Sequence, residues 1–148
     1  SFDRPVELPA AAATVAPAPS GRRTHPNGVV GVDHVVVAVD DLDETRRALA
    51  ASGIAVRREW SRPVGDTEVS YLFSVVAASL QESVAGTGAA PGLWGVTLVA
   101  EDLEVAAVHL GSDPERIRDA VQPGRRILGL DTRPRGGSVR LAVMSPRP

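Results

Sequence analysis

The sequence has 148 residues, of which 43% are hydrophobic and 23% are charged, a balance typical of a folded globular domain. The net charge of -2 and the aromatic content of 3% argue against a nucleic-acid-binding surface, and that charge leaves no polybasic anchor for a membrane. Cysteine is absent, which excludes disulfides and thiolate chemistry, and no apolar run approaches the roughly 18 residues that span a bilayer. We therefore expect a cytoplasmic protein that binds neither nucleic acid nor membrane.

The first 28 residues differ in composition from the rest. Residues 10–28 are rich in alanine and proline and end in the turn pair Asn27-Gly28, which predicts an extended arm or linker. From residue 29 onward the pattern is that of packed elements. We therefore divide the chain into an arm, 1–28, and one domain, 29–148.

The first half of the domain is predicted to be a strand, a helix and three more strands. Residues 29–39 are rich in valine, which suits a pleated, half-buried strand. Asp41 followed by Glu44 is a capping-box pattern, so a helix is expected over 42–51, ending before Gly53. Further strands are expected over 54–60, 68–75 and 79–84, and residues 85–91 form a loop.

The second half repeats this order. A strand is expected over 93–100 and a helix over 103–110, where Leu103, Ala106, Ala107 and Leu110 form a one-sided apolar stripe. Three strands follow, over 116–121, 126–130 and 138–144. The adjacent pair Arg125 and Arg126, after the turn at Pro123-Gly124, is expected to be solvated.

The two halves match at an offset of 61 residues. The pairs include Gly31 with Gly92, Val35 with Val96, Asp41 with Asp102, Leu42 with Leu103, and Leu49 with Leu110. A four-stranded unit with one helix cannot cover both faces of its sheet, so two such units are expected to bury a shared surface. The match fails at one place of chemical interest, where His34 corresponds to Gly95.

These stretches resemble the vicinal oxygen chelate superfamily of glyoxalase and bleomycin-resistance-like proteins. The resemblance is carried by residues 31–42 (GVDHVVVAVDDL), by their repeat at residues 92–104, and by residues 119–127 and 142–145. It implies an α+β fold in which two βαβββ modules, 29–86 and 91–148, form an open barrel around a small-molecule cleft. It also implies a homodimer, and a divalent metal held by a histidine or glutamate on the first strand and a glutamate on the last strand of each module.

Strand parity tests which residues could form that site. Side chains alternate between faces, so His34 is expected to point into the barrel as a metal ligand or general acid/base. On the strand over 79–84, placing Leu80 and Val84 toward the helix would put Gln81 in the cleft. A one-residue bulge would put Glu82 there instead, so both stay candidates for the metal. Further cleft residues are expected to be Trp60, Tyr71, Phe73, Trp94 and Thr97.

The second module lacks matching ligands. Gly95 has no side chain, and the last strand offers Arg140, Ala142 and Met144 but no carboxylate. A full four-ligand site therefore cannot be assembled from matching positions. Two functions remain open: a glyoxalase-like lyase, isomerase or dioxygenase with a degenerate metal site, or a metal-free protein that binds or sequesters a small molecule without catalysis.

Overall fold

The computed structural model describes residues 25–76 and 79–148, so most of the predicted arm lies outside the described residues. The strands are β1 (Val29–Ala38), β2 (Val56–Val64), β3 (Thr67–Val76), β4 (Ser79–Ala85), β5 (Gly92–Ala100), β6 (Arg118–Asp119), β7 (Arg126–Leu130) and β8 (Arg140–Met144). The helices are α1 (Leu42–Ala51), α2 (Leu103–His109) and two short 3₁₀ turns, η1 (Pro114–Arg116) and η2 (Arg133–Arg135).

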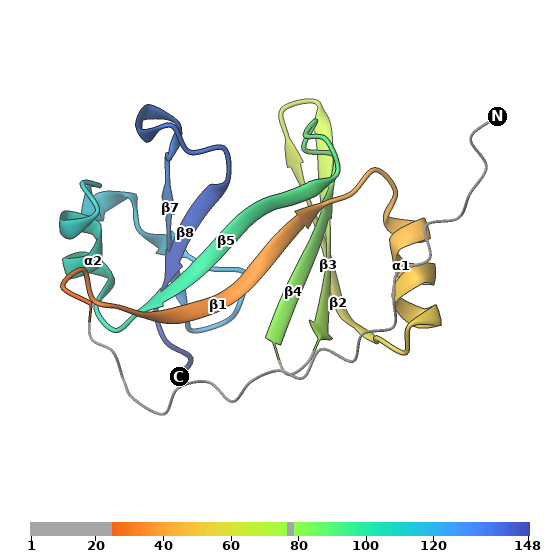
Figure 1. The fold of residues 1–148 in the computed structure, drawn as a ribbon, viewed down its shortest axis with the longest axis horizontal. Helices are drawn as coiled ribbons and strands as arrows, with labels where there is room; N and C mark the ends of the chain where they lie inside the picture. The colour runs from red at the N-terminus through yellow and green to blue at the C-terminus, as the bar shows by residue number, and fades with distance from the viewer. Residues whose placement is uncertain (1–24, 77–78) are drawn as a thin grey trace.

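All eight strands form one sheet in the order β2-β3-β4-β1-β5-β8-β7-β6. The two halves meet where β1 and β5 pair in antiparallel fashion. In each half the first strand then pairs in parallel with the last, β1 with β4 and β5 with β8. The sheet is strongly curled, with β1 and β5 crossing between the strands of the two halves (Figure 1). The predicted fold class, two βαβββ units in an open barrel-like sheet, is confirmed.

Both helices begin where the acidic caps predict. The Asp41 side chain accepts hydrogen bonds from the backbone N–H groups of Asp43 and Glu44, at 2.7 and 2.9 Å. Asp102 accepts from the N–H of Val105 at 2.9 Å in the same way. These bonds satisfy N–H groups that have no partner inside the helix. Gly53, just past α1, adopts a φ of 73°, the left-handed conformation that glycine takes most readily.

The strand predicted over 116–121 is mostly wrong. Only Arg118–Asp119 pairs as a strand, and the 3₁₀ turn Pro114–Arg116 precedes it. Asp113 caps this turn by accepting from the N–H of Glu115, and Pro114 has the φ that a helical first turn requires. Local capping therefore favours a 3₁₀ turn that includes Arg116, which the sequence pattern had assigned to a strand.

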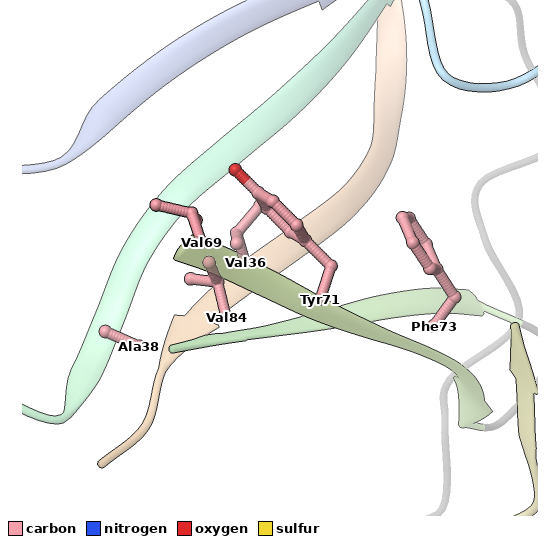
Figure 2. Packing of buried hydrophobic residues seen from close by; sticks show 6 residues of the cluster. All are labelled: Val36, Ala38, Val69, Tyr71, Phe73 and Val84. Atoms are coloured by element: carbon pink, nitrogen blue, oxygen red, sulfur yellow. The ribbon is translucent and has the colours of Figure 1, made fainter. Parts of the chain in front are cut away.

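The hydrophobic core has two parts. An inner cluster comes from β1, β3 and β4, and Figure 2 shows its members, Val36, Ala38, Val69, Tyr71, Phe73 and Val84. An outer cluster joins α2 to its half of the sheet through Ala100, Leu103, Ala106, Ala107, Leu128 and Val143. The predicted apolar stripe of α2 is therefore confirmed.

The assignment of Leu80 and Val84 to the helix-covered face is wrong. Val84 is completely buried in the inner cluster with Val36 and Ala38, and Leu80 packs against that cluster. Alternation along a strand separates two faces but does not say which face carries the larger apolar groups. Here the inner face carries them, because Tyr71 and Phe73 fill it.

Candidate functional site

The site starts at a β-bulge in β1. Val32 lies opposite Leu98 and His34 lies opposite Thr97, so Asp33 is an extra residue without a cross-strand partner. A bulge re-aims side chains that strict alternation would send to opposite faces. As a result the neighbours Asp33 and His34 contact each other, with Oδ2 of Asp33 2.8 Å from Nδ1 of His34.

His34 is the centre of a buried polar chain, which runs Arg125–Asp33–His34–Glu82. Its Nε2 atom lies 3.1 Å from Oε1 of Glu82, on β4. At the other end, Nη2 of Arg125 donates to Oδ1 of Asp33 at 2.8 Å. Arg125 is itself anchored, because its Nε and Nη2 both donate to the carbonyl oxygen of Ser145, at 3.0 and 2.8 Å. The polar chain thus joins the two halves of the domain.

Three of its four side chains are almost fully buried. Those of Asp33, His34 and Arg125 are 3–5% exposed, whereas that of Glu82 is 12% exposed. Glu82 is therefore the member of the buried polar chain that a bound molecule would reach first.

The charges of the chain set the protonation of its members. Burial alone would lower the pKa of His34, but hydrogen bonding and charge from Glu82 and Asp33 outweigh it and raise that pKa. Burial alone would raise the pKa of Asp33, but Arg125 and His34 outweigh it and lower that pKa. Because Asp33 is then a carboxylate, it accepts a hydrogen bond from Nδ1–H of His34, and Nε2 of His34 faces Glu82.

The donors present do not fit the metal that the resemblance implies. Of the two alternatives on β4, Glu82 lies beside His34, while Gln81 pairs with Val35 and so belongs to the opposite face. The counterparts in the second half, by register, are Gly95 for His34 and Ala142 for Glu82, and neither carries a ligating side-chain atom. Zinc and iron sites usually need at least three protein ligands. Within residues 25–76 and 79–148, no three His, Asp or Glu residues are grouped to hold an ion.

The predicted cleft residues lie around the same face, but as packed side chains. Tyr71 and Phe73 are buried in the inner cluster, and Trp60 and Trp94 are partly buried against it. Thr97 is 3% exposed. Two cavities lie elsewhere. One, of about 480 Å³, is between α1 and β2, and the other, of about 350 Å³, is beside α2 and η2. Neither is lined by His34 or by the predicted cleft residues.

Sequence reasoning missed two members of the chain, Asp33 and Arg125. The prediction that Arg125 is solvated is wrong, since it is 4% exposed and paired with Asp33, whereas its neighbour Arg126 lies at the surface with Glu104. The one available signal was a charged residue, Asp33, inside a strand of valines. Its partner lies 92 positions away, a separation that no local pattern bridges.

No protein-family model and no curated protein matches the sequence. Among solved structures, methylmalonyl-CoA epimerase from Mycobacterium tuberculosis superposes with a TM-score of 0.64 at 21% identity, covering 82% of this chain and 91% of that one. A Streptomyces coelicolor methylmalonyl-CoA epimerase in complex with 2-nitronate-propionyl-CoA gives 0.60 at 16%, covering 81% and 99%. A hypothetical protein from Bacillus halodurans gives 0.60 at 10%, covering 79% and 94%.

At these identities the likeness shows the fold alone. The chain therefore has the fold of these solved structures, which agrees with the paired modules that residues 31–42 and their counterpart at 92–104 predicted. No helix among the described residues has the length and apolar character needed to cross a membrane.

Proposed function

We propose that this protein is a metal-independent enzyme of the isomerase type, which binds a small oxygenated metabolite on the inner face of its curled sheet. Glu82 is the proton acceptor, and His34 is the residue that positions it. The observation that carries this proposal is the contact between Nε2 of His34 and Oε1 of Glu82, at the least buried end of an otherwise buried polar chain.

The chemistry expected of Glu82 is removal of a proton from a carbon next to a carbonyl group. The C–H bonding electrons remain on the substrate as an enolate, and the proton moves to the carboxylate. If the carboxyl proton is replaced by one from solvent water before it returns to the same side of the carbon, hydrogen is exchanged. If water instead delivers a proton to the opposite side of the carbon, while Glu82 releases its own proton to solvent, the configuration is inverted. His34 keeps one carboxylate oxygen in place, and the apolar surroundings strengthen the interaction between these groups.

Support from relatives is limited to the fold and to the reaction class that their names give. The epimerases named above are isomerases by name, and their fold is the fold of this chain. The absence of two of the four expected ligand positions, Gly95 and Ala142, is why the proposal includes no metal.

The test is exchange of carbon-bound hydrogen with solvent. Methylmalonyl-CoA, pyruvate and dihydroxyacetone are each incubated with the protein in D₂O containing EDTA, and loss of the α-proton signal is followed by ¹H NMR. We expect catalysed loss with at least one of them, and a rate at least a hundredfold lower for E82Q. The substitution E59Q, on the outer part of β2, is the matched control and should retain the rate.

A metal-free binding protein without catalysis is the second candidate. It is favoured by the packed aromatic side chains, which suit apolar recognition better than they suit an open reaction chamber. If none of the three compounds loses its proton but one raises the melting temperature, the enzyme proposal is wrong and this candidate replaces it.

We further propose that the protein is a homodimer and works in the cytoplasm. The fold resemblance supports the first, and the cysteine-free composition is compatible with the second. Light scattering should give about twice the chain mass of 15.4 kDa, and a value equal to one chain would refute the dimer.

A further inference from the structure

One row of residues crosses the inner face of the sheet through Glu82. Each member lies opposite the next on the neighbouring strand, so the row is fixed by backbone pairing. From β2 to β8 it runs Arg58, Phe73, Glu82, Val36, Gly95 and Arg140. Glu82 is thus the acid in a row with an arginine at each end.

Arg140, at the β8 end, is held against an aromatic ring. Its guanidinium carbon lies 4.6 Å from the centre of the Trp94 ring. Trp94 is the extra residue of a bulge between Leu93 and Gly95, and it packs against the inner cluster. Stacking fixes the plane of the guanidinium and leaves its N–H edge free to bind an oxyanion by two parallel hydrogen bonds.

The two ends of the row are not equivalent. Arg58 donates from Nη1 to the carbonyl oxygen of Val121, so it already braces a segment of the second half. Arg140 has no carboxylate partner within the part of the chain that the structure describes, unlike Arg46, Arg125, Arg126 and Arg133. Arg140 is therefore the cation of the row that is available to a bound anion.

The row also sets the size of what fits between Arg140 and Glu82. Three strand spacings of about 4.8 Å separate them, so their backbones are about 14 Å apart along the sheet and closer through space where it curls. Gly95 contributes no side chain to this stretch, and Val36 gives it an apolar floor. A short apolar body with a charge at one end matches this arrangement.

We propose that Arg140, stacked on Trp94, is the subsite for the anionic group of the ligand, which is a small organic carboxylate or phosphate whose apolar body extends over Gly95 and Val36 toward Glu82. This inference rests on the proposed function, because it names the substrate class for the same face. It assigns the charge recognition to the second half of the domain and the proton transfer to the first.

Two indole N–H signals make the test specific, since Trp60 and Trp94 are the only tryptophans of the chain. Labelled protein is titrated with benzoate, phenyl phosphate and the uncharged isostere benzamide, and the ¹H–¹⁵N spectrum is recorded at each step. We expect saturable movement of the Trp94 signal with one of the two anions, and at least tenfold weaker binding of benzamide. The stronger anion tells carboxylate from phosphate ligands.

Variants separate a binding role from a structural one. R140Q should weaken the anion at least tenfold while the rest of the spectrum stays in place, and R140K should retain part of the affinity because it keeps the charge. The matched control is R62Q, since Arg62 lies 5.7 Å from the Trp60 ring in a similar stack on β2. It should leave the Trp94 titration unchanged.

Equal affinity for benzoate, phenyl phosphate and benzamide, or an R140Q protein that binds the anions as the parent does, would overturn the subsite. Failure of the proposed function is visible separately. If E82Q exchanges substrate hydrogen as fast as the parent while R140Q still loses the anion, the subsite stands and the role of Glu82 falls.

Discussion

Replacing Arg125 by methionine should destabilise the protein strongly. The substitution keeps most of the side-chain volume but leaves the carboxylate of Asp33, whose side chain is 5% exposed, without its cationic partner. The carbonyl oxygen of Ser145 also loses two donors. Removing one partner of a buried ion pair costs about 3–5 kcal/mol, a large part of a typical domain stability of about 5–15 kcal/mol.

Urea denaturation followed by circular dichroism measures this loss, and a double-mutant cycle assigns it to the pair. In D33N, Arg125 keeps its two bonds to Ser145, so this variant should lose less than R125M. The double variant D33N/R125M contains no orphaned charge, and it should recover about 1–3 kcal/mol relative to the sum of the two single changes.

The neighbouring position supplies the control. Arg126 forms an ion pair with Glu104 at the surface, so R126M should leave the unfolding midpoint almost unchanged. A loss below about 1 kcal/mol for R125M, or strict additivity in the cycle, would show that the chain from Arg125 to Asp33 is not the coupled buried unit that its distances indicate.

Two further predictions concern His34 and the missing ligands. Because Glu82 and Asp33 raise the pKa of His34 against the effect of burial, protonation favours the folded state: this stabilisation is complete below the unfolded value of about 6.5 and is lost as the pH rises through the folded pKa. The free energy of unfolding should therefore fall as the pH rises above about 6.5, and it should fall less in H34Q. If the free energy of unfolding depends on pH with the same slope in both proteins, His34 is not the group responsible. For the metal, Zn²⁺, Ni²⁺ and Mn²⁺ should leave the melting temperature of the parent protein unchanged. The variant G95H/A142E supplies the two missing ligands, so the same ions should raise its melting temperature. The rise should be equivalent to about 2.7 kcal/mol when the ion concentration is a hundred times the dissociation constant. A clear rise for the parent would mean that His34 and Glu82 suffice to hold an ion.

The sequence predicted the parts of this fold that local chemistry decides. Asp41 and Asp102 cap their helices because a carboxylate can satisfy the free N–H groups of a first turn, whatever the rest of the chain does. The repeat at an offset of 61 residues predicted the pairing of two similar units, because neither unit can bury its sheet alone.

The site could be predicted only in part. The choice between Gln81 and Glu82 depended on which face of the sheet Tyr71 and Phe73 of β3 occupy beside β4. That is a property of the assembled sheet and not of the strand sequence. The partnership of Asp33 with Arg125 depended on a bulge, which changes strand parity without leaving a mark in the hydrophobic pattern. The prediction that both arginines are solvated was wrong for Arg125 and correct for Arg126. Adjacent residues can differ in exposure because the path of the backbone points their side chains in different directions.

Two of the three bulges between β1 and β5 lie at matching positions of the repeat, and they give the duplication its chemical meaning. Asp33 and Trp94, the extra residues of these two bulges, are themselves 61 positions apart, so a bulge occurs at the same place in both halves. In the first half it brings a carboxylate against His34, and in the second it brings an indole beneath Arg140. The two matching bulges thus support the proposed proton transfer on one side and a cationic, aromatic surface on the other. A symmetric metal site requires the two halves to be alike, whereas a site that holds a ligand at one end and exchanges its proton at the other requires them to differ.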